Sequence, residues 1–377
     1  MIIRFLLAAC ALMCLSGCSG LSYYAQAAQG QWRLLSARQD VDDVLQTELT
    51  PEVRRGLQLS QQVLSFAEEQ LGITGDGRYT TYVELPGRAV VWNVFASDAD
   101  QVRAYTWCYP IVGCAPYRGY FSEARAQAYA NQLDAEGWDT FVGAVPAYST
   151  LGWFEDPLLS SFITWPEGDL VNLIVHELAH SRVWVASDVV FNENFASFVA
   201  DQATRAWFLM YTEAGAQRLQ AWLTSQRQWA LLRGLLLRFK GELTETLADL
   251  EPVAAGLAKS QAYAALQRCY AEAREQLGGR RYDSLMSRLN NAYLVSLGTY
   301  ADWQGAFAQI FAASDGSWSQ FFAEVERLAD LPAGERRAHM EALLAQQQEH
   351  AQADDDSAEQ IHCQAFAGHG GDTEASG

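Results

Sequence analysis

Two histidines spaced four residues apart, with a glutamate next to the first, are the residues of this sequence best suited to chemistry. His176 and His180 enclose Glu177, Leu178 and Ala179 and form the pattern HExxH. On a helix, residues i and i+4 share a face, so both imidazoles can bind one metal ion. Glu177 then lies beside the ion, where a carboxylate can accept a proton from an attacking water molecule.

Histidine usage supports the interpretation of this pair as metal ligands. The chain has six histidines, and the other four lie near its C-terminal end, at positions 339, 350, 362 and 369. The alternative is a pair of core histidines that satisfy their own hydrogen bonds. We expect ligands, because the only two histidines in the body of the chain have ligand spacing.

A catalytic zinc site needs a third protein ligand and an open position. The metzincin pattern would place Gly and His where Val183 and Ala186 stand, so that class is excluded. Glu193 is the better candidate. Its segment, FNENFA, resembles the NExFA segment of gluzincin peptidases, in which a second helix supplies a glutamate. In the alternative interpretation, Glu193 is a carboxylate that only complements a helix dipole.

The elements that must position these side chains are two consecutive helices. Apolar residues at helical spacing surround the histidines, and Gly168-Asp169 offers an N-cap. A tight turn around residues 186–188 would reverse the chain into the second helix. Asp188 and Asp201 are weaker candidate ligands than Glu193.

The fold class predicted around this helix pair is α+β, predominantly α-helical. Helical periodicity covers residues 23–71 and most of the chain after residue 170. β-Branched and aromatic residues predict a small mixed sheet at about 78–165, including two strands joined by a turn at Pro86-Gly87. A formal net charge of −19 argues against a nucleic-acid partner.

The N-terminus predicts export. Residues 1–17 have the charge and apolar run of a signal peptide, and Leu15-Ser16-Gly17-Cys18 resembles a bacterial lipobox. We therefore expect Cys18 to carry lipid and to anchor the chain to a membrane, on the periplasmic face of the outer membrane. An uncleaved or simply secreted signal is the alternative. Cys108 and Cys114 are close enough to close a small loop, although the sequence leaves their pairing open.

Together these segments resemble a bacterial family of predicted aminopeptidase lipoproteins. The resemblance rests on HELAH, FNENFA, the segment at 114–121 and VPAYSTLGWF at 145–154, and it continues into LNNAYL and TYADWQGAF. It implies a zincin-like fold, a zinc ion held by His176, His180 and Glu193, and Glu177 as the catalytic carboxylate.

Substrate-contacting residues are predicted around this site. In zincins, an edge strand before the HExxH helix pairs with extended substrate, which makes Ala144 and Tyr148 candidates for substrate binding. The sequence has no obvious acidic motif for the free α-amine of an aminopeptidase substrate, but Asn192, with Glu155 and Asp156, lies in a plausible neighbourhood and is a third candidate. A tyrosine is the expected donor to the oxyanion, with Tyr300 preferred over Tyr293, Tyr148 and Tyr120.

The sequence as a whole predicts a signal peptide at 1–17, one peptidase domain at 18–347 with its metal core at 140–205, and a disordered acidic tail at 348–377. The expected activity is zinc-dependent hydrolysis of peptides, as an aminopeptidase with Glu177 as general base. Two alternatives remain open: an envelope zinc endopeptidase, and a non-catalytic lipoprotein that retains the zincin fold.

Overall fold

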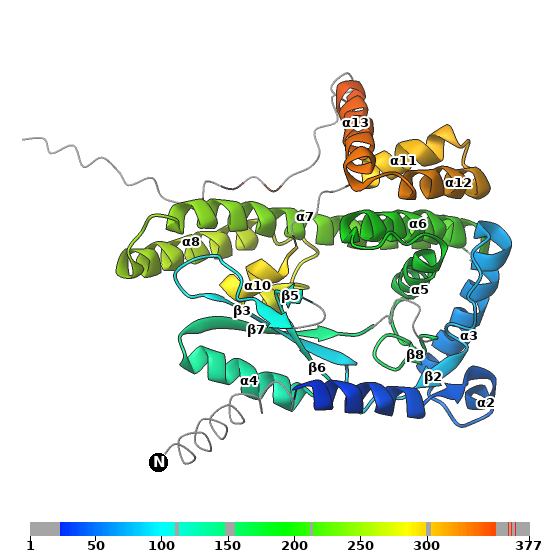
Figure 1. Cartoon of the computed structure of the whole chain (residues 1–377), viewed down its shortest axis with the longest axis horizontal. Helices are drawn as coiled ribbons and strands as arrows, with labels where there is room; N and C mark the ends of the chain where they lie inside the picture. Colours follow the sequence, from blue (N-terminus) through cyan, green and yellow to red (C-terminus); the bar gives the residue numbers. More distant parts are fainter. Residues whose placement is uncertain are drawn as a thin grey trace, which may run out of the picture.

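The computed structural model describes residues 23–109, 113–147, 155–211, 214–298 and 303–351, together with residues 361, 363 and 366. Helices dominate and strands are few and short, which confirms the α-rich α+β class (Figure 1). After a helical stretch at 23–36, the named helices are α2 (Val41–Leu45), α3 (Pro51–Phe66), continued by the π-helical η1 (Ala67–Leu71), α4 (Glu123–Ala135), α5 (Glu167–Arg182), α6 (Val189–Tyr211), α7 (Gly215–Leu247), α8 (Pro252–Ala273), α9 (Asp283–Met286), α10 (Asn291–Ser296), α11 (Gln304–Ala313), α12 (Trp318–Ala329) and α13 (Ala333–Ala351). The strands are β1 (Gln39–Asp40), β2 (Thr81–Val83), β3 (Val91–Asp98), β4 (Trp107–Tyr109), β5 (Gly113–Ala115), β6 (Arg118–Tyr120), β7 (Trp138–Val145) and β8 (Leu158–Leu159).

The central sheet is antiparallel, in the order β6-β3-β7. Successive residues of β3 face opposite sides. Val94 and Ala96 pack with the small residues of α4, whereas Phe95 stacks on Phe141 of β7. Phe141 in turn meets the ring of Tyr293 on α10, with 4.8 Å between ring centroids. The sheet therefore lies between α4 and α10 (Figure 1).

The strands predicted at 78–165 do not form one sheet. A second three-stranded sheet has the order β1-β2-β8, with β2 parallel to β8, and a separate hairpin joins β4 to β5. The two strands expected to be joined at Pro86-Gly87 thus belong to different sheets. The reason is that β2 pairs with β8, which lies far along the sequence and shortly before α5, rather than with β3, the next strand in the sequence. The hairpin carries a disulfide between Cys108 and Cys114.

The helices form two apolar cores. In one, α5 and α6 pack against each other, against α3 and against the α11–α13 group. In the other, α7 and α8 form a hairpin whose buried residues include Leu235, Leu236, Phe239 and Leu266. Figure 1 shows α7 running on from α6 along one side of the molecule. None of the helices in the described ranges is both long and apolar enough to span a bilayer.

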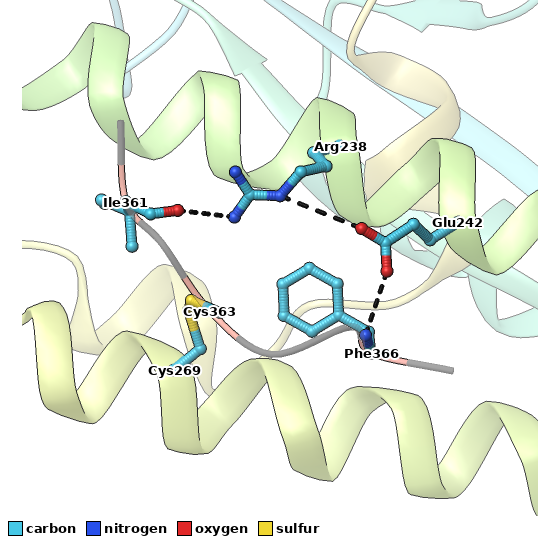
Figure 2. The surroundings of a disulfide bond; sticks show 6 residues. All are labelled: Arg238, Glu242, Cys269, Ile361, Cys363 and Phe366. Carbon is cyan, nitrogen blue, oxygen red and sulfur yellow. Dashed lines mark hydrogen bonds and ion pairs between the residues drawn. A yellow bond between two sulfur atoms is a disulfide. The ribbon is translucent and has the colours of Figure 1, made fainter. Parts of the chain in front are cut away.

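Three residues near the C-terminus, Ile361, Cys363 and Phe366, lie against the α7–α8 hairpin (Figure 2). Cys363 forms a disulfide with Cys269 of α8, and the side chains of Ile361 and Phe366 are buried in the hairpin core. Arg238 of α7 donates to the Ile361 carbonyl at 2.7 Å, and Glu242 accepts from the Phe366 N–H at 3.0 Å. At these three positions the structure corrects the expectation of a disordered tail, because apolar burial and a covalent bond fix them.

Candidate metal centre

Helix α5 carries both histidines and is held by one buried face. Leu170, Ile174 and Leu178 are fully buried on it, whereas His176 and His180 lie on a partly open side. The helix begins at Glu167, with Pro166 at the N-cap and no side-chain cap, rather than at the predicted Gly168-Asp169 cap. Acidic residues in the first turn and His180 and Arg182 in the last turn complement the helix dipole.

The turn between α5 and α6 is fixed by side-chain hydrogen bonds. Ser187 adopts a left-handed conformation, with φ of 65°. Asp188 caps α6 by accepting from the Phe191 N–H at 3.1 Å. The buried amide of Asn192 accepts from the Val185 N–H at 2.8 Å and donates to the Val185 carbonyl at 2.9 Å. The turn therefore has a defined shape, which fixes the start of α6 and so the position of Glu193 next to α5.

Three donor groups converge between the two helices. Glu193 lies 3.3 Å from Nε2 of His176 and 3.6 Å from Nε2 of His180, through its two carboxylate oxygens. One ligand atom from each residue lies within 4.8 Å of the others, an arrangement that could hold a metal ion. Asp188 pairs with Arg336 and Asp201 with Asn172, so neither belongs to this group.

The spacing of these donors fits a tetrahedral ion. Zinc–ligand distances of about 2.1 Å correspond to a tetrahedral edge of about 3.4 Å. The two histidine–glutamate separations, 3.3 and 3.6 Å, lie on either side of that edge. The Glu193 side chain is 42 % exposed and that of His180 only 9 %, so the group opens on the Glu193 side.

Proton affinities differ among the three ligands. Burial lowers the pKa of His176, but the hydrogen bond with Glu193 and the charges of Glu177, Glu193 and Asp201 outweigh it and raise the pKa overall. Burial and the neighbouring His176 lower the pKa of His180 to about 4. The hydrogen bond from His176 lowers the pKa of Glu193. The group thus favours an ionised Glu193 and a cation beside it.

A cavity of about 570 Å³ adjoins the group. Its lining among the described residues combines apolar, acidic and basic side chains: Trp165, Pro166, Asp169, Asn172, Leu173, His176, Glu177 and Arg281. The volume is within the range of small-ligand sites. Glu177 therefore reaches the same cavity as His176, as expected for a carboxylate that acts beside a metal.

The buried side chain of Tyr79 lies close enough to Glu177 for the carboxylate charge to affect its pKa. The pKa of Tyr79 is raised well above its ordinary value, first by burial and then by the charges of Glu177 and Asp156. Its backbone has a φ of 62°, which is rare for a tyrosine, and its N–H donates to the Asp156 carbonyl at 2.8 Å. Sequence reasoning missed Tyr79, since a lone tyrosine after a glycine cluster carries no recognisable signal.

The remaining predicted residues have mixed placements. Ala144 lies on β7, an edge strand, and is exposed. The Asn192 amide is held by Val185, as described above. Cys18, Tyr148 and Tyr300 lie outside the described residues, so their predicted roles stay predictions. The alternative tyrosines, Tyr120 and Tyr293, are packed into separate cores away from the lining of this cavity.

A comparison with known protein families also supports a peptidase. A family model described as "Putative aminopeptidase" matches residues 22–340. The chain belongs to this family. The match includes α5, α6 and the turn before α9, and it ends before the three residues near the C-terminus that lie against α7 and α8. No curated protein and no solved structure matches the chain.

Proposed function

We propose that this chain is a zinc-dependent peptidase, and first of all an aminopeptidase. The observation that carries the proposal is the convergence of His176, His180 and Glu193 beside a cavity that His176 and Glu177 line. Membership of an aminopeptidase family supports peptide bonds as the target. Two neutral imidazoles and one carboxylate are a donor set that suits zinc.

The chain's own groups supply the proton transfers. A bound zinc ion would contribute a Lewis acid and would lower the pKa of water. Glu177 accepts the proton of a water molecule as the water oxygen bonds to the scissile carbonyl carbon. As the C–N bond breaks, Glu177 passes that proton to the leaving nitrogen, so the carboxylate ends ionised as it began.

The surrounding fold is proposed to be zincin-like. Support comes from the consecutive helices α5 and α6, which supply the ligands from facing sides. The edge strand β7 supports a second element of the proposal, in which extended substrate pairs with backbone near Ala144. The lipobox supports a lipid anchor at Cys18 and an outer-membrane location, and both stay proposals.

The deciding experiment compares the purified protein with Glu177→Gln. We expect one zinc per chain in both proteins, with peptide hydrolysis lost in the variant and abolished in the wild type by chelation. Glu69→Gln, on the exposed face of η1, is the control and should retain full activity. Hydrolysis by Glu177→Gln at the wild-type rate would rule out the mechanism.

Blocked and unblocked peptides separate the alternatives. N-Acetylation should abolish cleavage by an aminopeptidase, because such an enzyme must recognise the free α-amine. Cleavage of acetylated peptides at internal bonds would instead identify an endopeptidase. Stoichiometric zinc without hydrolysis of any peptide would favour the non-catalytic alternative.

A further inference from the structure

Arg281 lines the cavity that also contains His176 and Glu177. It is the one Arg or Lys among the described residues of that lining, in a chain with 45 acidic and 26 basic residues. The other charged residues of the lining are the carboxylates Asp169 and Glu177. Asp169 already accepts hydrogen bonds from Trp222 at 3.3 Å and Gln226 at 3.2 Å. The lining therefore offers one guanidinium to an anionic ligand.

The turn that carries Arg281 is built against α7. It lies between α8 and α9 and contains Gly278 and Gly279, whose φ angles are 82° and 72°. The positive φ of Gly278 is one that other residues rarely adopt, and its Cα faces the side chain of Gln228 on α7, where a Cβ would lie 2.5 Å from Oε1. The turn is therefore held close to α7 and places Arg281 at the cavity.

The guanidinium itself is oriented by two neighbours. Nη1 of Arg281 donates to the Ser225 hydroxyl at 2.6 Å, and the guanidinium carbon lies 5.5 Å from the centroid of the Tyr282 ring. Tyr282 is buried and packs near Trp229. Arg281 is itself exposed, and these two contacts orient its guanidinium and reduce the rotamer freedom it would lose on binding a ligand.

The charge of Arg281 is not neutralised within the described part of the chain. Its neighbours differ, since Arg280 and Arg274 both pair with Asp283, at 3.1 and 3.3 Å. No described carboxylate lies within ion-pair distance of Arg281, and Ser225 uses one of its five N–H donors. The free donors match the planar, bidentate geometry that carboxylates prefer.

We propose that Arg281 is a specificity-determining residue that binds a carboxylate of the peptide substrate. The proposal rests on the peptidase function proposed above and names its substrate class: peptides with an anionic group close to the scissile bond. The carboxylate has two possible sources, an acidic side chain and the free C-terminus of a short peptide. Both offer the same chemistry to the guanidinium.

Binding to the zinc-loaded Glu177→Gln protein tests the proposal without turnover. Calorimetry would compare alanine pentapeptides that carry a C-terminal acid or amide, and others that carry Glu or Gln at each position in turn. We expect at least one carboxylate peptide to bind about tenfold to a hundredfold more tightly than its neutral partner. The pair that shows the preference identifies the source of the carboxylate.

Variants connect that preference to Arg281. Arg281→Gln should abolish the preference, Arg281→Lys should keep part of it, and the neighbouring Arg280→Gln should leave it unchanged. Thermal melting would confirm that each variant is folded. The proposal is overturned if no carboxylate peptide is preferred, or if Arg281→Gln retains the full preference.

Failure of this inference is distinguishable from failure of the proposed function. Hydrolysis by the wild type without any carboxylate preference would leave the peptidase standing and remove the role of Arg281. An Arg281-dependent preference in binding, with no hydrolysis of any peptide by the wild type, would remove the peptidase and leave a carboxylate-binding site.

Discussion

The three candidate ligands, His176, His180 and Glu193, shift one another's pKa values. His176 is drawn toward its protonated form by Glu193 and its acidic neighbours, whereas His180 is kept neutral by burial and by His176. A metal ion must displace the proton on His176 but meets almost none on His180 at neutral pH. The metal affinity of the centre should therefore depend on pH through one histidine rather than two.

This pH dependence can be predicted with its sign. The raised pKa of His176 means that its ring gains a proton as the pH falls through that value, and zinc affinity falls with it. Since the pKa of His180 is about 4, the slope of log affinity against pH should be about one between pH 5 and 6. Competition with a chromophoric chelator over this range measures it. A slope near two would show that His180 titrates normally.

Removal of the glutamate ligand is the second prediction at this scale. Glu193→Gln takes away the negative ligand that contacts both histidines, so zinc affinity should fall by at least about 100-fold, more than loss of an outer partner. Metal content after dialysis against a weak chelator measures the loss. Glu326→Gln is matched in exposure, at 44 % against 42 %, and pairs with Arg182 of α5. An equal loss of metal in both variants would contradict the assignment of Glu193.

At the scale of helices and strands, the position of the first residues of α6 depends on α13. Arg336 of α13 is buried, donates twice to Asp188 at 2.7 and 2.9 Å and also donates to the carbonyls of Ala329 and Leu331. Its guanidinium lies 5.3 Å from the ring of Phe191. Through Asp188, α13 thus fixes the turn from which Glu193 reaches the histidines.

Substitution of that arginine should destabilise the protein and weaken the site. Arg336→Met keeps the apolar stem but leaves Asp188 without its partner, which should lower the free energy of unfolding by about 3–5 kcal/mol. Zinc affinity should fall about tenfold, because the turn before Glu193 loses its support. Urea unfolding and chelator competition measure the two effects. Arg337→Ala, whose pair with Glu341 is exposed, should leave the stability unchanged.

The elements also show what the sequence could predict. The α5–α6 pair followed from helical periodicity, and the candidate ligands His176 and His180 followed from their spacing, which are local properties of the chain. Glu193 followed from the resemblance of its segment to that of gluzincin peptidases. The pairing of Tyr82 with Leu158 was missed, because partners 76 positions apart leave no local pattern. Arg281 was missed for the same reason: its place in the same cavity lining as His176 depends on how α8 returns along α7.

At the scale of the whole molecule, covalent bonds join parts that are distant in sequence. The Cys269–Cys363 disulfide has a sequence separation of 94, against six for Cys108–Cys114. The pairing of Cys269 was not predicted, because an interval of that length is compatible with any partner. Its burial beside Ile361 and Phe366 fixes these residues near the C-terminus on the α7–α8 hairpin (Figure 2).

The two disulfides should differ in their effect on stability. From the entropy of the closed loop, Cys363→Ser should lower the free energy of unfolding by about 4.7 kcal/mol and Cys114→Ser by about 2.3 kcal/mol. Chemical denaturation with and without a reductant measures both. Equal losses in the two variants would contradict the loop-entropy explanation, which requires the longer loop to contribute more.

The Cys269–Cys363 disulfide would also hold the chain together after a proteolytic cut within its loop. It closes a covalent ring that contains the turn at 274–282, where the side chain of Arg280 is 88 % exposed and accessible to trypsin. A cut after Arg280 would place His176, His180 and Glu193 on one fragment and Arg281 on the other. Both fragments would remain a single species until the disulfide is reduced, so a nicked chain should keep the two walls of its cavity together.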